Sequence, residues 1–162
     1  MNFLESEDLK QGRRPLFLFL IVTLGVGALA SLFTAPAIPT WYAALNRPSF
    51  APSNSVFAPV WTALQILTAI AGWRAWRRTG LKSPEMAAFA IQLALNFAWS
   101  VLLFGLHQTG AALIEIVMLN MAVLATLLLF FRRDRWAGLL FLPYLAWTLF
   151  AAFLTQALWR LN

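Results

Sequence analysis

The chain has 162 residues, of which 61% are apolar and only 11% are charged, and its net charge is +6. A soluble domain carries roughly a quarter charged residues, so this composition excludes an ordinary soluble protein and predicts an all-α integral membrane protein. The chain has no cysteine, which excludes disulfides, thiolate metal sites and cysteine nucleophiles. The positive charge does not predict nucleic-acid binding, because the basic residues lie at the ends of apolar segments.

Long stretches without charged residues separate the charged clusters. They are Leu16–Ala35, Pro48–Trp73, Met86–Ile114 and Trp136–Trp159. Each is long enough to cross ~30 Å of hydrocarbon at ~1.5 Å per helical residue. One more span, over residues 110–131, contains the single charged residue Glu115. The sequence therefore predicts a five-transmembrane-helix bundle, with helices at roughly 15–36, 55–77, 85–106, 110–131 and 136–159, after a short N-terminal segment over residues 1–14.

Prolines suggest where the first helix begins and ends. Pro15 suits a helix start, and Pro36 suits a helix stop. Residues 37–54 are rich in proline and aromatic residues, and we expect them to form an ordered loop that acts as a lid. The sequence Ala35-Pro36-Ala37 resembles a signal-peptide cleavage site, but the 20-residue apolar run before it exceeds the usual ~7–15 residues. We therefore interpret the segment as a membrane span.

The basic residues sort to one side of a five-span arrangement. Ten of them fall on the side of the N-terminus, against Arg47 and Arg160 on the other. The positive-inside rule then predicts a cytoplasmic N-terminus, with the long first loop and the C-terminus on the opposite face. The ten are Lys10, Arg13, Arg14, Arg74, Arg77, Arg78, Lys82, Arg132, Arg133 and Arg135.

Polar and aromatic residues recur at helical spacing within three spans. Because unsatisfied polar groups facing lipid are costly, we expect these faces to turn toward one another. Interhelical hydrogen bonding is enough to explain any single polar residue on these faces. Bulky aromatic residues on all three faces instead indicate that the faces line a cavity. The faces are Trp61, Gln65, Thr68 and Gly72; Gln92, Asn96, Trp99 and Ser100; and Tyr144, Trp147, Thr148, Ala151 and Thr155.

The eight tryptophans divide into two groups by depth. Trp41, Trp73, Trp76, Trp136 and Trp159 lie near span ends, as in an aromatic belt. The other three, Trp61, Trp99 and Trp147, lie between mid-bilayer and the first-loop face. We expect these three to line a site for a planar apolar ligand.

Several other residues are candidates for function or packing. Glu115 is an intramembrane carboxylate, for which a structural role and a ligand role stay open. His107 stands without further ligands at metal-binding spacing, so no metal site is predicted and axial haem ligation has little support. No catalytic motif is present. Small residues form two stripes: Gly27, Ser31 and Ala35, interpreted as a packing seam, and Ala90, Ala94 and Ala98, interpreted as a homodimer face.

Five motifs, in order along about three quarters of the chain, resemble the TspO/MBR family of tryptophan-rich sensory and translocator proteins. The motifs are Trp41-Tyr42-x-x-Leu45-x-Arg47-Pro48 with Pro52; Val56-Phe57-x-Pro59-Val60-Trp61; Gln92-Leu93-x-Leu95-Asn96-x-x-Trp99-Ser100; Trp136-Ala137-Gly138; and Pro143-Tyr144-Leu145-x-Trp147-x-x-Phe150-Ala151.

The resemblance implies a five-helix bundle, commonly dimeric, that binds porphyrin or haem-related tetrapyrroles and, in some members, sterols or isoquinoline-type ligands. No cofactor is implied beyond such a ligand. Some bacterial members are reported to degrade protoporphyrin in light, which would place such chemistry on Trp61 and Trp147. With the residue patterns above, the expected ligand-binding set is Tyr42, Phe50, Phe57, Trp61, Gln92, Asn96, Trp99, Tyr144, Trp147 and Ala151.

The chain departs from the family pattern at two places. Phe50 and Pro52-Ser53 replace a tryptophan and a double proline in the first loop, and the end of the fifth helix lacks the tyrosine of a proposed cholesterol motif. Sterol is therefore not predicted as the native ligand. The leading hypothesis is a tetrapyrrole-binding sensor, scavenger or transporter. The alternatives are a light-dependent porphyrin-degrading enzyme and a regulatory partner of another membrane protein.

Overall fold

A computed structural model of the protein describes residues 13–162. Five helices in it are long and apolar enough to cross a membrane, which confirms the predicted number of spans. The N-terminal segment predicted over residues 1–14 lies almost entirely outside the described residues. The elements are α2 (Arg13–Ala37), η1 (Ile38–Tyr42), α3 (Asn54–Thr79), α4 (Pro84–Ser100), η2 (Val101–Gly105), α5 (Thr109–Arg133) and α6 (Arg135–Leu161), where η marks a π-helical turn.

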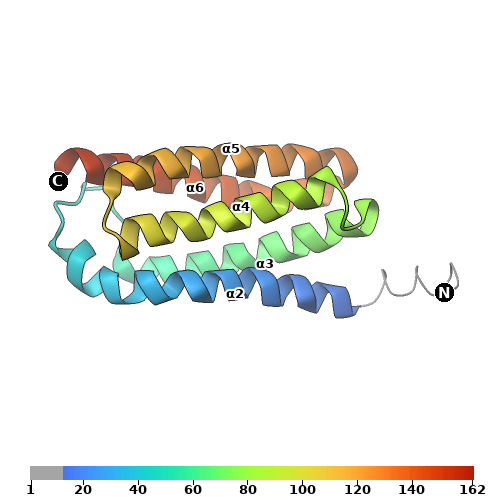
Figure 1. The fold of residues 1–162 in the computed structure, drawn as a ribbon, viewed down its shortest axis with the longest axis horizontal. Coiled ribbons are helices and arrows are strands. Elements are labelled where there is room, and N and C mark those ends of the chain that lie inside the picture. The colour runs from blue at the N-terminus through green and yellow to red at the C-terminus, as the bar shows by residue number, and fades with distance from the viewer. Residues whose placement is uncertain (1–12) are drawn as a thin grey trace, which may run out of the picture.

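The helices form a closed ring in which α2 is the most loosely held member. Going round the bundle, the order is α2, α3, α6, α5 and α4, with α5 and α6 sharing the most extensive interface. Only a small share of α2 is buried against the other helices. Figure 1 shows α2 along one edge of the bundle, beside α3 and α4. The bundle therefore has a tightly packed side and a loosely packed side.

The first helix continues beyond the predicted stop at Pro36, so that prediction was wrong. Each proline removes one amide donor, and the chain widens into the π-helical turn that contains Pro39 instead of ending. Tertiary contacts hold this extension: Tyr42 is only 1% exposed, and the Trp41 ring stacks on His107 with centroids 4.3 Å apart. Trp41 and Tyr42 thus lie on a helix rather than in the predicted loop.

The segment between η1 and α3 is shorter than the lid predicted over residues 37–54. It is tied to the end of α6, because the Asn46 N–H donates to Asn162 Oδ1 at 3.0 Å and Asn162 Nδ2 donates to the Asn46 carbonyl at 3.2 Å. The Arg47 guanidinium lies 5.6 Å from the centre of the Tyr42 ring and donates to Asn54 Oδ1. These contacts hold the first-loop end of the bundle closed.

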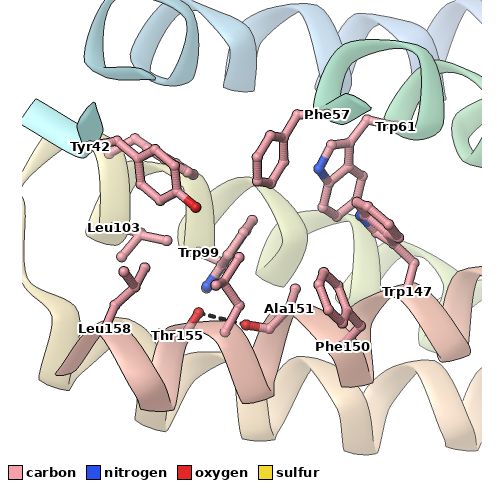
Figure 2. Close-up of a pocket in the computed structure, with 12 residues that line it drawn as sticks. Tyr42, Phe57, Trp61, Trp99, Leu103, Trp147, Phe150, Ala151, Thr155 and Leu158 are labelled. Carbon is pink, nitrogen blue, oxygen red and sulfur yellow. Dashed lines mark hydrogen bonds between the residues drawn. The ribbon is translucent and has the colours of Figure 1, made fainter. Parts of the chain in front are cut away.

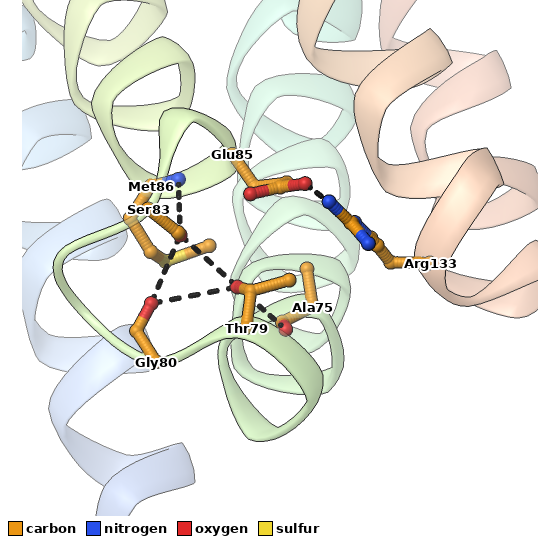
Figure 3. Close-up of polar contacts among 7 residues, drawn as sticks. All are labelled: Ala75, Thr79, Gly80, Ser83, Glu85, Met86 and Arg133. Atoms are coloured by element: carbon orange, nitrogen blue, oxygen red, sulfur yellow. Dashed lines mark hydrogen bonds and ion pairs between the residues drawn. The ribbon is translucent and has the colours of Figure 1, made fainter.

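Two ion pairs fasten the opposite, basic end of the bundle. Arg133 Nε lies 2.7 Å from Glu85 Oε1 and so joins α5 to α4 (Figure 3). Arg74 Nη2 lies 2.9 Å from Asp134 Oδ2 and so joins α3 to the start of α6. Because the Glu85 and Asp134 side chains are nearly buried, each pair replaces lost hydration with a charged partner. This end is therefore fixed by charge as well as by packing.

The three polar faces predicted from helical spacing do turn inward. Gln65, Gln92, Asn96, Thr148 and Thr155 are all buried. Burial separates the tryptophans only in part: Trp99 is buried among the helices, whereas Trp61 and Trp147 are half-buried. By contrast, the belt residues Trp136 and Trp159 are more than half exposed, where they would meet the membrane interface.

Candidate functional site

Two cavities lie side by side in the first-loop half of the bundle. The larger has a volume of about 360 Å³, within the range of small-molecule sites. It lies between α2, α3 and α4, and its lining residues are Leu24, Gly27, Ala28, Ala30, Ser31, Thr34, Ala35, Ile38, Asn54, Phe57, Ala58, Trp61, Thr62, Gln65, Asn96, Trp99, Ser100 and Phe104.

The smaller cavity is almost filled by the side chains around it. Its volume is about 10 Å³, room for roughly one water molecule. Figure 2 shows the aromatic rings converging on it from η1, α3, α4 and α6. Its lining residues are Tyr42, Phe57, Trp61, Trp99, Leu103, Phe104, Trp147, Phe150, Ala151, Leu154, Thr155 and Leu158.

Four aromatic residues line both cavities and so form a partition between them. We call Phe57, Trp61, Trp99 and Phe104 the aromatic wall. The Trp61 and Trp99 centroids are 6.0 Å apart, and those of Trp99 and Phe104 are 5.8 Å apart. Such tilted and edge-to-face pairs are the favoured aromatic geometries. The wall therefore offers a continuous aromatic surface to anything in the larger cavity.

Two buried amides, Gln65 and Asn96, line the larger cavity beside its apolar and hydroxyl-bearing residues. Gln65 and Asn96 are both at least 95% buried. Gln65 lies against Gly27, where an added Cβ would come within 3.4 Å of the Gln65 side chain. Within residues 13–162, Asn96 Nδ2 has no hydrogen-bond partner. A buried unpaired donor is costly. Nδ2 adjoins Tyr144 and is itself closed off from the cavity, so the amide must turn before a ligand can accept a hydrogen bond from it.

Seven of the ten sequence-predicted ligand-binding residues line a cavity, and these seven fall into three groups. The smaller cavity brings together Tyr42, Trp147 and Ala151, and the larger cavity brings in Asn96. Phe57, Trp61 and Trp99 line both cavities as part of the aromatic wall.

Three predicted residues do not line either cavity. Phe50 is 52% exposed and packs edge-on against Phe150 outside the bundle. Gln92 is fully buried in the core. Tyr144 is also buried, and its ring packs edge-on against Trp61 behind the aromatic wall. Phe50, Gln92 and Tyr144 thus surround the site without reaching its surface.

Sequence reasoning missed the contribution of α2. The small residues Gly27, Ser31 and Ala35, interpreted as a packing seam, line the larger cavity instead. Gly27 does approach Gln65 closely, but α2 stands off from α3 further along. The helical spacing of these small residues does mark a functional or packing face. Small side chains leave space that either a neighbouring helix or a ligand can fill.

Glu115 and His107 lie outside both cavities. Glu115 is 4% exposed, and within the described chain neither carboxyl oxygen has a hydrogen-bond partner. His107 is exposed in the short link before α5, with a positive φ of 56° and its ring against Trp41. In the described residues, no three acidic or histidine side chains gather as metal ligands.

The fold and the cavities define a class: a multi-pass membrane protein with five helices around an internal, aromatic-lined site. Comparison with known proteins narrows this class. The model of the TspO/MBR family matches residues 18–160, and the chain belongs to that family.

Relatives match over three quarters or more of the chain. The tryptophan-rich protein TspO of Archaeoglobus fulgidus is 40% identical over 144 residues, which cover 88% of this chain and 94% of the relative. The tryptophan-rich sensory protein of Cereibacter sphaeroides is 35% identical, with 91% of each chain covered. The translocator protein of Sus scrofa is 37% identical over 126 residues, 75% of each chain.

Proposed function

We propose that the protein binds a flat, apolar ligand of the tetrapyrrole class in the larger cavity, as a membrane sensor, scavenger or transport component. The observation that carries this proposal is the pairing of a 360 Å³ cavity with the aromatic wall along one side. A planar macrocycle gains from stacking on such a surface as well as from leaving water. The names of the relatives, "sensory protein" and "translocator protein", agree with sensing or transport.

Asn96 supplies the polar contact in this proposal. Its Nδ2 lacks a partner but is closed off from the cavity, so a turn of the amide would let a carbonyl or carboxylate of the ligand accept from it. A hydrogen bond to a neutral acceptor is worth about 1 kcal/mol, and one to a charged acceptor more. Asn96→Leu should therefore weaken binding of protoporphyrin IX by about fivefold to thirtyfold, measured from the porphyrin absorbance during titration of the detergent-purified protein.

Gln92→Leu is the matched control. Gln92 is another buried amide one turn away on α4, but it does not line either cavity. This variant should bind protoporphyrin IX as the unchanged protein does. Equal weakening by both substitutions would indicate a general effect on packing and would contradict the assignment of Asn96 to the site.

Binding without turnover is the better-supported form of the proposal. Light-driven degradation would involve Trp61 and Trp147, yet only Trp61 lines the larger cavity, while Trp147 lies behind the wall with its ring 6.4 Å from Phe57. Porphyrin should therefore be recovered intact after illumination. Loss of its absorbance in light, abolished by Trp61→Phe together with Trp147→Phe, would favour the enzyme instead.

We also propose a homodimer and a membrane orientation. Ala90 and Ala94 are exposed on the outer face of α4 and Ala98 is half-buried, which supports this small-residue stripe as a self-association face. The N-terminal start of α2 and the arginine-rich ends of α3 and α5 lie at one end of the bundle. Positive charge favours the cytoplasmic side, so this end would face the cytoplasm.

A further inference from the structure

The larger cavity has a mouth between α2 and α3. The cavity mouth consists of lining residues that are exposed: Leu24, Ala28, Ser31 and Ala35 on α2, and Ala58 and Thr62 on α3. The residues that α4 and η2 contribute, Asn96, Trp99, Ser100 and Phe104, are all buried. The cavity therefore deepens from the α2–α3 side of the molecule toward α4.

The other edges of α2 are sealed. On the α4 side, the Phe33 ring packs edge-on against Phe97 with centroids 6.1 Å apart. It also lies so close to Gly105 that an added Cβ would come within 2.8 Å of it. Toward the basic end, the Thr23 hydroxyl donates to the Gln65 carbonyl at 3.1 Å and closes the space between α2 and α3. The gap between α2 and α3 thus opens only on the first-loop side of this contact.

Neither aqueous end of the bundle offers a comparable opening in the described structure. At the first-loop end, Asn46 and Asn162 are joined by hydrogen bonds, and Tyr42 and Phe57 are buried beneath that end. At the basic end, ion pairs join the helices, and Phe89, Phe130 and Phe141 pack together below them. The cavity mouth instead lies on the flank of two spans, where the surroundings are lipid.

We propose that the larger cavity is loaded and emptied sideways, from the bilayer leaflet on the first-loop side, through the cavity mouth. This inference rests on the proposed function and deepens it: the ligand is a membrane-dissolved amphiphile, with an apolar body and a polar group that hydrogen-bonds to the Asn96 amide. The small side chains on the α2 rim leave a low barrier for a flat body to pass. Weak burial of α2 lets this helix yield as the ligand passes.

The test uses variants that narrow the cavity mouth and measures the rates of ligand association and dissociation. The protein is placed in lipid nanodiscs, and association and dissociation of protoporphyrin IX are followed by tryptophan quenching. Ala58→Phe and Ser31→Phe put a bulky ring on each rim. Each should slow association and dissociation together by about tenfold, a barrier increase of ~1.4 kcal/mol, while the equilibrium Kd changes by less than about threefold. A retained Kd also shows that each variant is folded.

Neighbouring positions on the same helices provide the controls. Ala63 and Leu32 are exposed but do not line the cavity, so Ala63→Phe and Leu32→Phe should leave both rates unchanged. Asn162→Ala, which loosens the first-loop end, should also leave them unchanged.

Three outcomes would overturn the lateral route. They are unchanged rates in both rim variants, faster dissociation with weakened Kd in those variants, and faster association in Asn162→Ala. Failure of the proposed function looks different: the unchanged protein would then show no saturable quenching by protoporphyrin IX at all.

Discussion

At Gly138, one added methyl group should lower the stability of the fold. A Cβ built there would lie 2.6 Å from Phe131 Cδ2 and 2.8 Å from the Phe131 Cα, so backbone as well as side chain would have to move. We expect Gly138→Ala to destabilise the protein by ~1–3 kcal/mol, seen as a lower Tm by circular dichroism in detergent. Gly25→Ala is the control, since open space surrounds it; this variant should be neutral or slightly stabilising. Equal Tm values for the two variants would contradict the close α5–α6 approach.

Asp134 should make stability depend on pH. Burial opposes its charge, but hydrogen bonds from Arg74 and from the Ala137 and Trp136 N–H groups outweigh burial and lower the pKa of Asp134. A carboxyl whose folded pKa lies below its unfolded value of ~3.9 stabilises the fold above that value and loses this contribution as pH falls through the folded pKa.

The matched variant is Asp134→Asn, because asparagine keeps the helix cap and removes the charge. The unchanged protein should have the higher Tm at neutral pH, and the difference should shrink as the pH falls below ~4. A Tm difference that is the same at both pH values would show that the ion pair with Arg74 contributes nothing.

At the scale of elements, the extension of α2 depends on the contact between Trp41 and His107. His107 adopts a left-handed backbone at φ 56°, which costs a non-glycine residue roughly 1 kcal/mol, and its ring stacks on Trp41 at an interplanar angle of 11°. His107→Ala loses the stack and keeps the strain, whereas His107→Gly loses the stack and relieves the strain. We expect the alanine variant to have the lower Tm. The opposite order would show that the backbone is not held left-handed.

The number of spans and their inward faces could be predicted because both follow from local pattern. Charge-free runs of sufficient length indicate helices, and the four-residue spacing from Gln92 to Asn96 places both amides on one buried face. The end of the first helix could not be predicted, because Pro36 reads as a stop until distant contacts of Trp41 and Tyr42 are known.

The lining of the cavities was predictable only in part. Trp61 and Trp99 stood out by their depth in the membrane, but Phe50 was included on motif likeness and is exposed. The stripe containing Gly27 and Ser31 is compatible with tight packing or with a cavity. Which of the two forms depends on how far α2 stands from α3, and the spacing of residues along one helix does not contain that distance.

At the scale of the whole molecule, the outer face of α4 should govern self-association. Ala94 is exposed there, and a larger side chain would hold two copies of the helix apart. Ala94→Leu should shift the mass in detergent, measured by light scattering or ultracentrifugation, toward the monomer. Ile91→Leu, a volume-conserving change at a neighbouring exposed site, is the control. A monomeric unchanged protein, or a dimer indifferent to Ala94→Leu, would contradict this face.

A bulky side chain placed inside the larger cavity shows whether a ligand occupies that cavity. Ala30 is 7% exposed and lines the cavity, so Ala30→Phe would place a ring inside it; Ala87→Phe, on an exposed position of α4, is the control. Tryptophan fluorescence of the purified protein is titrated with protoporphyrin IX in the dark. We predict saturable quenching at micromolar ligand for the unchanged protein and for Ala87→Phe, and loss of saturable quenching in a folded Ala30→Phe variant. Quenching that never saturates, or that saturates equally in all three, would show that the ligand does not occupy this cavity.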